Sequence, residues 1–237
     1  MVDVHCHEGT DISDPGIIRI INGTDPESSV NAIESANKNS HVWACVGIHP
    51  EEINDSRFMI HELKQNLKRL AQNNKVVGVG EVGLDYRQGI SETDKNKQKE
   101  IFIKMIELAI ETGLPIVVHN RNADEDILQM LYAHSSLLKD KILMHCFTRN
   151  TDFMDKMADL GAYFSFGGFL LGENNSRVRK AAKMAPEDRI LLETDGPFTK
   201  TDVKIVASEL ARARGLTEVK TDQLTSENAR RLFTKMI

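Results

Sequence analysis

The sequence predicts an α/β fold, a single-domain (β/α)8 barrel of the TIM type. Eight short runs rich in apolar and β-branched residues recur along the chain, and amphipathic segments separate most of them. Such nearly continuous apolar strands are typical of parallel sheets covered on both faces. The chain has 237 residues, 41% of them hydrophobic, and barrels of roughly 250 residues are single domains. We therefore expect residues 1–237 to form one barrel rather than an open doubly wound sheet.

The expected elements follow one another in regular alternation. Strands are predicted at 2–6, 16–23, 42–48, 75–82, 114–119, 141–147, 162–167 and 189–194. Helices are predicted near 27–38, 57–73, 92–112, 123–133, 151–159 and 175–184, and after the last strand at 201–214 and 225–235. Asp25 before Pro26, Ser91 and Asn150 are helix start signals. Gly215 is expected to end the helix that precedes it.

The first connection does not fit the pattern. Between His7 and Gly16 only the eight residues EGTDISDP are available, whereas a parallel crossover takes about a dozen residues or more. We expect the first crossover helix to be missing, with a bare loop on that side of the barrel. The uncovered flank could bind a partner protein, or a helix from the tail could cover it.

Composition excludes several classes of protein. No stretch approaches the ~20 apolar residues of a membrane span, and MVDVHCHEG lacks the features of a signal peptide. Cys6, Cys45 and Cys146 are far apart, so a cytoplasmic protein without membrane partners is expected. The formal net charge is −5, so bulk electrostatic attraction would not hold nucleic acid. An anionic substrate would need its charge offset within the site.

The run VVGVGEVGLD at 76–85 allows two interpretations. Its glycines, Gly78, Gly80 and Gly83, have the spacing of a dinucleotide-binding loop. However, Gly83 is followed by LDYRQGISETD rather than by a helix start, and the run lies in mid-chain. The alternative is a strand that ends close to a functional carboxylate, Glu81, with glycines that make space beside it. We favour the second interpretation.

Histidines and carboxylates occur where predicted strands end. His5 and His7 alternate along the first strand, so both should point into the barrel while Cys6 points outward. The other strand ends supply Glu81, His119, His145 and Asp195. Barrel enzymes place their sites at this face. Such N and O donors would suffice for two divalent ions about 3.5–4 Å apart, with Glu81 as the bridge.

The motifs VDVHCH, VGIHPEE, GEVGLDYR, LPIVVHNR, HCF and LLETDGP resemble the TatD family of metal-dependent deoxyribonucleases, which are amidohydrolase-type barrels. The resemblance runs in order from residue 2 to about 198. It implies a two-metal phosphodiesterase that uses Mg, Mn or Zn and cleaves DNA, single-stranded DNA included. The implied ligands of one ion are His5, His7, Glu81 and Asp195, and those of the other are Glu81, His119 and His145. Asp195 would also take the proton from the attacking water. The chain further resembles short family members from anti-phage defence operons.

Three departures from the family's pattern affect the rim of the site rather than its ligands. Glu51 stands where the family often has His, HCFTRN replaces HCFSG, and TDGPFTKTD lacks an Arg-Asn-Glu-Pro segment. Four residues are candidate substrate-binding or supporting groups. His49 could contact a phosphate, Arg121 could pair with a phosphate or form a salt bridge, Asp85 could orient a ligand His, and Tyr86 borders the site.

Two other functions stay open at this point. The first is hydrolysis of an amide, lactone or small phosphoester by the same type of barrel. Many amidohydrolase barrels bridge their ions with a modified lysine, so Glu81 in that role favours the nuclease branch. The second is a weakly catalytic, metal-binding subunit of a larger assembly, although none of the expected ligands is lost.

Overall fold

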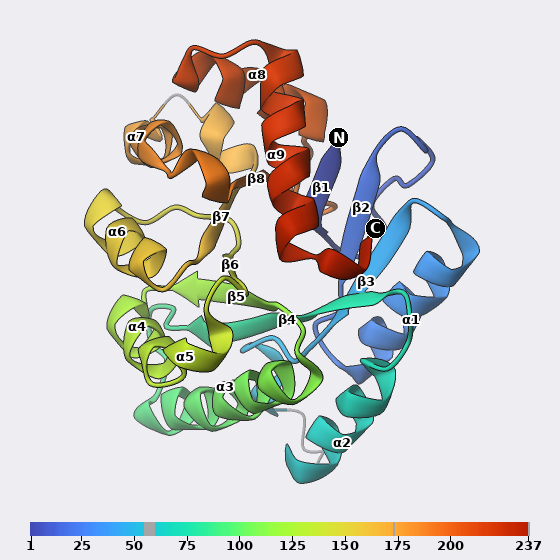
Figure 1. Ribbon diagram of the computed structural model, residues 1–237. Coiled ribbons are helices and arrows are strands. Elements are labelled where there is room, and N and C mark those ends of the chain that lie inside the picture. The colour runs from blue at the N-terminus through green and yellow to red at the C-terminus, as the bar shows by residue number, and fades with distance from the viewer. Residues whose placement is uncertain (55–59, 173, 237) are drawn as a thin grey trace.

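A computed structural model describes residues 1–54, 60–172 and 174–236. These residues form one sheet of eight parallel strands in the order of the sequence, and the sheet curves into a nearly closed barrel (Figure 1). The predicted fold is therefore confirmed. The strands are β1 (Val2–Cys6), β2 (Ile18–Asn22), β3 (Val42–Val46), β4 (Val76–Asp85), β5 (Ile116–Arg121), β6 (Ile142–Met144), β7 (Tyr163–Phe166) and β8 (Ile190–Leu192).

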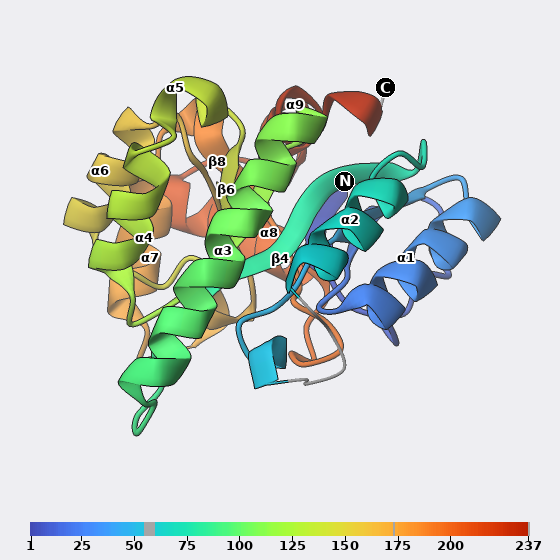
Figure 2. The ribbon, with the colours of Figure 1, turned by 90° about the horizontal axis from the view of Figure 1, so that it is seen from below.

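Helices cover the outside of the barrel. They are α1 (Pro26–Lys38), α2 (Ile60–Leu70), α3 (Glu92–Thr112), α4 (Asp124–Tyr132), α5 (Ser135–Leu138), α6 (Thr151–Asp159), α7 (Ser176–Met184), α8 (Val203–Arg214) and α9 (Glu218–Leu232). Short 3-10 turns are η1 (Glu52–Asn54), η2 (Gly168–Leu171), η3 (Glu187–Arg189) and η4 (Thr234–Met236). Figure 2 shows α1, α2 and α3 side by side on one flank. None of the helices in the described ranges is long and apolar enough to cross a bilayer.

The three helix start signals act as expected. The side chains of Asp25, Ser91 and Asn150 accept hydrogen bonds from the third residue of α1, α3 and α6 respectively. These bonds satisfy backbone N–H groups that have no partner within the helix. Two elements differ from expectation, since α5 was not predicted and the last helix begins at Glu218 rather than near 225. Thr217 caps that helix by accepting from the Lys220 amide at 3.2 Å. The predicted start at 57 lies outside the described residues.

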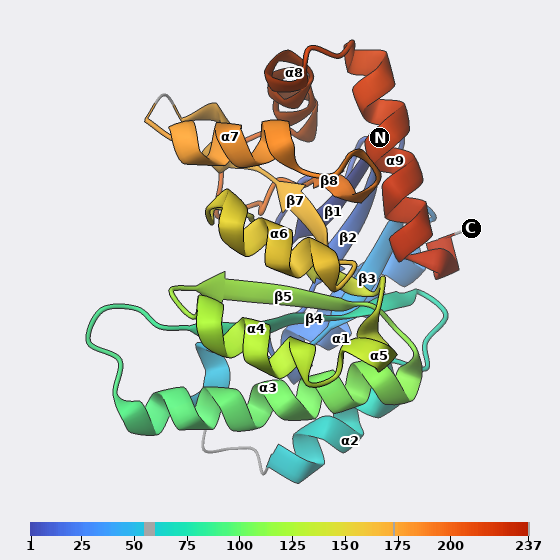
Figure 3. The same cartoon turned by 60° about the vertical axis from the view of Figure 1, so that its left-hand side comes forward.

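The first crossover helix is missing, as the short connection predicts. Residues 7–17 contain no helix and connect β1 to β2 as a loop. The tail of the chain lies elsewhere: Ala229, Leu232, Phe233 and Met236 pack with the inward-facing side chains of the strands. Figure 3 shows α9 at the end of the barrel opposite the strand arrowheads. The C-terminal helix therefore closes the bottom of the barrel, and the arrowhead end stays open for a site.

The barrel closes between β1 and β8 through a few specific bonds. The Asp195 amide donates to the His5 carbonyl at 2.9 Å, and the His7 amide donates to the Gly196 carbonyl at 2.6 Å. The buried Asp3 carboxylate accepts from the amide and the hydroxyl of Thr194, at 2.9 and 2.8 Å. This seam holds the segment after β8 against the histidines of β1.

Candidate metal centre

Glycine allows β4 to lie unusually close to β5, and this approach positions Glu81. A Cβ on Gly80 would lie 2.5 Å from the Cβ of Val117, and one on Gly83 would lie 2.0 Å from the His119 carbonyl oxygen. Gly83 also has a φ of +144°, which side chains rarely adopt. The whole run 76–85 is strand. It makes no phosphate-binding turn, so the dinucleotide interpretation is wrong and the glycines serve strand packing instead.

The alternation of inward- and outward-pointing residues along β1 changes part of the way through the strand. The register with β2 shifts between Asp3 and Cys6, so Val4 packs inside the barrel whereas Cys6 packs in the core between the barrel and the helices. His5 and His7 consequently both reach the centre of the barrel mouth, where their Nε2 atoms are 3.1 Å apart. This agrees with the inward placement expected from sequence.

Each oxygen of the Glu81 carboxylate faces its own group of imidazoles. Oε2 lies 3.3 Å from the Nε2 atoms of both His5 and His7. Oε1 lies 2.8 Å from His119 Nδ1 and 2.7 Å from His145 Nε2. On the first side, the Asp195 Oδ1 atom is 3.4 Å from His7 Nε2 and 3.8 Å from His5 Nε2. All the predicted ligands thus meet around one buried carboxylate.

Neighbouring acceptors orient the ring nitrogens. His7 Nδ1 lies 2.9 Å from the Asn22 carbonyl oxygen, so Nδ1 donates to that carbonyl and Nε2 is the nitrogen that faces the centre. His119 Nε2 lies 3.1 Å from Asp85 Oδ2, which turns Nδ1 toward Glu81 in the same way. The structure thereby places Asp85 behind His119. Glu193 is fully buried behind His145, with Oε2 3.8 Å from His145 Nδ1.

The centre brings carboxylate oxygens and imidazole nitrogens close together. These electron-rich atoms repel one another unless a cation or protons lie between them. Although burial opposes ionisation, the charge of His145 and hydrogen bonds from the imidazoles hold the pKa of Glu81 well below its usual range. Burial likewise opposes the charge of His7, but hydrogen bonds to Asp195 and Glu81 raise the pKa of His7 to about 9. Burial lowers the pKa of His5. An anionic carboxylate among converging nitrogens matches the donor set that divalent metals prefer.

Three overlapping sets of donor atoms each lie within 4.8 Å of one another. They are His5, His7 and Glu81; His5, His145 and Asp195; and His49, Glu81 and His119. His49 is the unexpected member, because its Nε2 atom is 3.4 Å from Glu81 Oε1. The sequence suggested only a phosphate contact for it. A proline follows His49, and residue 49 does not belong to a regular strand. The sequence therefore gave no indication that this side chain points inward.

The remaining predicted residues are spread over the rim. Arg121 is mostly exposed, with its side chain 60% accessible and Nη1 3.9 Å from Asp85 Oδ2. Tyr86 turns away and donates its hydroxyl to Asp126 at 2.6 Å. Glu51 forms an ion pair with Arg87. Arg149 of the altered HCFTRN segment donates to Asp124 at the start of α4.

A cavity of about 820 Å³ opens over the centre. Its walls include residues that sequence reasoning missed, namely Arg177, Phe169 and Phe198. Phe198 is 74% exposed and its ring centroid lies 5.1 Å from that of His7, while Phe169 is 48% exposed. The segment TDGPF places an aromatic residue close after Asp195, and that was the available signal for Phe198.

A parallel eight-stranded barrel with histidine and carboxylate donors at the carboxyl ends of its strands defines a metal-dependent hydrolase of the TIM-barrel class. Within that class the chain belongs to the TatD family, because residues 2–234 match the family's sequence model, described as TatD related DNase.

Known proteins similar to this chain agree with that assignment. The uncharacterized metal-dependent hydrolase YabD of Bacillus subtilis (strain 168) is 34% identical over 225 residues, which cover 90% of this chain and 86% of YabD. The 3'-5' ssDNA/RNA exonuclease TatD of Enterobacter lignolyticus is 30% identical over 180 residues, 76% of this chain and 67% of that protein. The crystal structure of YJJV, a TatD homolog from Escherichia coli, has the same fold. It matches with a TM-score of 0.86 at 23% identity and covers 99% of this chain and 98% of that one.

Proposed function

We propose that this protein is a two-metal phosphodiesterase that cleaves nucleic acid, with DNA as its first candidate substrate. The observation that carries the proposal is the position of Glu81, whose two oxygens face two separate sets of imidazole nitrogens. A bridging carboxylate of this kind suits a pair of ions close together. A relative named as an exonuclease supports the choice of substrate.

The proposed ligands of the first ion are His5, His7, Glu81 and Asp195. Those of the second are Glu81, His119 and His145, with His49 as an additional donor. Bound divalent ions, whether Mg, Mn or Zn, would stabilise the negative charge that develops on a phosphodiester during attack by water. Support for two sites rather than one comes from two of the three donor sets, which both contain Glu81, one with His5 and His7 and the other with His49 and His119.

Asp195 is the proposed general base. Water adds to phosphorus, the bond from phosphorus to the leaving sugar oxygen breaks, Asp195 accepts the proton of the water, and the leaving oxygen takes a proton from solvent. Although burial opposes ionisation, a hydrogen bond with His7 lowers the pKa of Asp195. The carboxylate is therefore ionised and able to accept a proton near neutral pH.

The rim supports a nucleotide over a small aliphatic substrate. Of the eight phenylalanines in the described ranges, six are buried and two are exposed, and both exposed rings, Phe169 and Phe198, line the cavity. Exposed aromatic rings beside an anion-binding centre suit stacking against nucleobases. Arg121 and Arg177 line the same cavity and are suited to pair with phosphates.

The rival chemistry, hydrolysis of a small amide or ester, has less support. A β-aspartyl dipeptidase shares the fold with a TM-score of 0.61 at 16% identity, which is a likeness of fold alone. No lysine is found among the described residues that line the cavity, which supports Glu81 rather than a modified lysine as the proposed bridge. A weakly catalytic subunit is also less well supported, because the full ligand set is present.

The decisive experiment measures cleavage of labelled single- and double-stranded DNA and RNA with Mg, Mn or Zn. We expect cleavage that EDTA abolishes and that His119→Ala reduces by more than ~100-fold. His134→Ala is the matched control, because His134 lies in the turn between α4 and α5, away from the cavity, with Nδ1 2.9 Å from the Met130 carbonyl oxygen. Phe198→Ala should raise KM for an oligonucleotide. Tight metal binding without hydrolysis of any nucleic acid would contradict the proposed function.

A further inference from the structure

Helix α7 carries an excess of positive charge on an acidic protein. Its sequence SRVRKAAKM contains Arg177, Arg179, Lys180 and Lys183 and no acidic residue, whereas the whole chain has 35 acidic and 30 basic residues. The neighbouring helix α6 shows the opposite balance, with three aspartates and one lysine. The positive charge on α7 is therefore local rather than a reflection of composition.

Three of the four basic side chains of α7 share the side away from the core, while Arg179 is half-buried and donates to the Gly172 carbonyl. Val178, Ala181 and Ala182 are buried and fix the inner face of the helix, while Arg177, Lys180 and Lys183 are exposed at three-residue spacing. Residues three apart are neighbours on a helix surface, where like charges destabilise the helix slightly. This arrangement slightly destabilises the folded protein, so stability does not explain it and a functional reason is needed.

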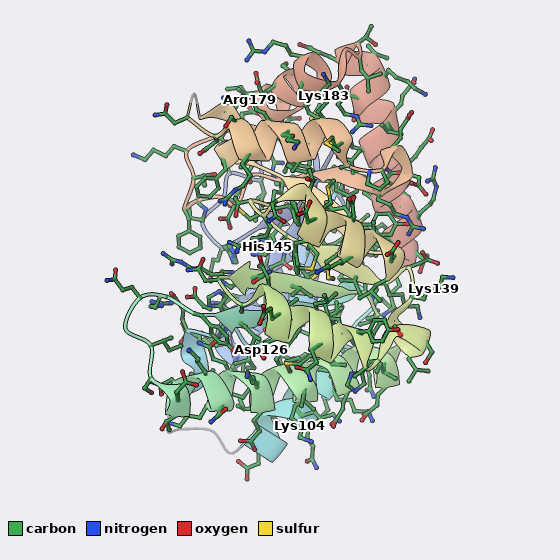
Figure 4. The ribbon with its side chains drawn as sticks, turned by 90° about the vertical axis from the view of Figure 1, so that its left-hand side faces the viewer. Lys104, Asp126, Lys139, His145, Arg179 and Lys183 are labelled. Carbon is green, nitrogen blue, oxygen red and sulfur yellow. The ribbon has the colours of Figure 1, made fainter. Side chains whose placement is uncertain are left out.

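The basic side chains continue from the catalytic cavity onto the outer surface. Arg177, in the first turn of α7, lines the cavity above the metal centre. A second hollow of about 460 Å³ lies between α7 and α8 and is lined by Arg179, Lys180, Lys183, Glu209, Arg212 and Ala213. Figure 3 shows that α7 begins at the arrowhead end of the barrel. Figure 4 shows Arg179 and Lys183 together in the upper part of the molecule, on α7, and Lys139 away from them at the right.

Few of the described carboxylates lie beside Lys180, Lys183 and Arg212. Glu209 pairs with Arg212 at 2.7 Å and is the one acidic side chain among the described residues that line the hollow. Within the described ranges no carboxylate forms an ion pair with Lys180 or Lys183. The Arg214 guanidinium donates to the carbonyls of Ala182 and Ala185, at 2.8 and 2.9 Å. It thereby ties the end of α7 to α8 and keeps the hollow in place.

We propose that the exposed basic side of α7, together with Arg212 of α8, is a second contact surface for the substrate. We call these residues, Arg177, Arg179, Lys180, Lys183 and Arg212, the α7 basic surface. It binds backbone phosphates of the same nucleic-acid strand, beyond the nucleotide held at the metal centre. From Arg177 to Lys183 the helix rises about 9 Å, which suits about two consecutive phosphates. The inference rests on the proposed function, and it makes a polynucleotide rather than a dinucleotide the preferred substrate.

Binding tests the α7 basic surface without any cleavage. The full-length protein, held in EDTA, is titrated with fluorescein-labelled oligothymidylate of about 12 nucleotides, within the usual site sizes of single-strand binders. Fluorescence anisotropy gives Kd at several salt concentrations. In Lys180→Ala/Lys183→Ala the slope of log K against log salt should fall by about 1.4, because each lost contact with a single strand removes about 0.7. Lys139→Ala/Lys220→Ala changes the net charge equally on exposed lysines elsewhere and should keep the wild-type slope.

Cleavage provides the second readout. With metal present, the α7 double variant should raise KM for the 12-nucleotide substrate by about tenfold, as expected for the loss of two phosphate contacts, and leave kcat within about twofold. A slope and a KM equal to those of the control variant would overturn the inference while the proposed function stands. Salt-dependent binding that weakens in the α7 variant, in a protein that cleaves no nucleic acid, would support this surface and overturn the proposed function instead.

Discussion

At the scale of single residues, the chemistry depends on one buried carboxylate. Glu81 is 3% exposed, and burying a charge without partners is costly. Its two oxygens lie close to imidazole nitrogens from β1, β5 and β6, and to His49. The free-energy cost of burying the Glu81 charge is therefore offset by the neighbouring imidazoles. These imidazoles must themselves be unprotonated when they bind metal. Asp195 differs in being partly accessible, with a side chain 20% exposed, as a group that contacts water should be.

Replacement of Asp195 separates its two proposed roles. Asp195→Asn retains an oxygen for the ion but loses the basic carboxylate. We therefore expect it to keep the fold and most of the bound metal, while kcat falls by more than ~100-fold. Circular dichroism, metal analysis and steady-state kinetics measure these three properties. Asp188→Asn, on an exposed turn, is the matched control. Near wild-type hydrolysis by Asp195→Asn would remove Asp195 from the mechanism.

At the scale of elements, helices far from the centre are joined by ion pairs. Lys64 of α2 lies 2.8 Å from Glu107 and 2.7 Å from Glu111, both on α3, and Lys68 lies 2.7 Å from Glu111. The hydrogen bond from Lys64 and then that from Lys68 lower the pKa of Glu111 from 4.5 to about 2. Since the folded-state pKa is depressed, the stabilisation is complete above pH 4.5 and disappears as pH falls toward 2.

Removal of the shared lysine should reveal this pH dependence. Lys64→Met is expected to lower the free energy of unfolding by up to about 1 kcal/mol at pH 7, because Glu107 and Glu111 are partly exposed and solvent screens their charges. The difference from wild type should shrink between pH 4.5 and pH 3. Urea unfolding at several pH values measures it. Lys38→Met removes an isolated, exposed i,i+4 pair on α1 and should have a smaller effect. A difference that grows in acid would contradict this explanation.

At the scale of the whole molecule, the metal centre joins distant parts of the chain. Its donors come from residues 5 to 195, on strands across the barrel. Two ions bound as proposed would together cross-link β1, β4, β5, β6 and the segment after β8. Because such ions would bind the folded chain and not the unfolded one, they would stabilise the fold by linkage.

Metal removal should therefore lower Tm, and the size of the effect should depend on pH. At metal concentrations of 100 Kd the stabilisation is about 2.7 kcal/mol, or several degrees for a chain of this length. In the metal-free chain the pKa of His7 is about 9, so His7 is protonated at neutral pH and must lose that proton to bind an ion. The stabilisation should increase as pH rises from 6.5 to 8.5. Thermal unfolding with and without EDTA measures it, and His134→Ala should respond like wild type. A Tm shift that is larger at pH 6.5 would contradict the assignment of His7.

The sequence by itself determined the alternation of strands and helices, the missing first helix and the set of six candidate donors. These follow from local periodicity and from the rule that barrel enzymes place their sites where the strands end. Only the tertiary structure decided how those donors divide around Glu81, that His49 joins them, and that Tyr86 turns away. It also placed Phe169, Phe198 and Arg177 of α7 around the same cavity, and it put α9 across the bottom of the barrel. These features depend on distances between residues far apart in the chain. Such distances are set by strand register, by the close packing at Gly80 and Gly83, and by the seam between β1 and β8. The glycines were visible in the sequence, but the register and the seam have no local signal there.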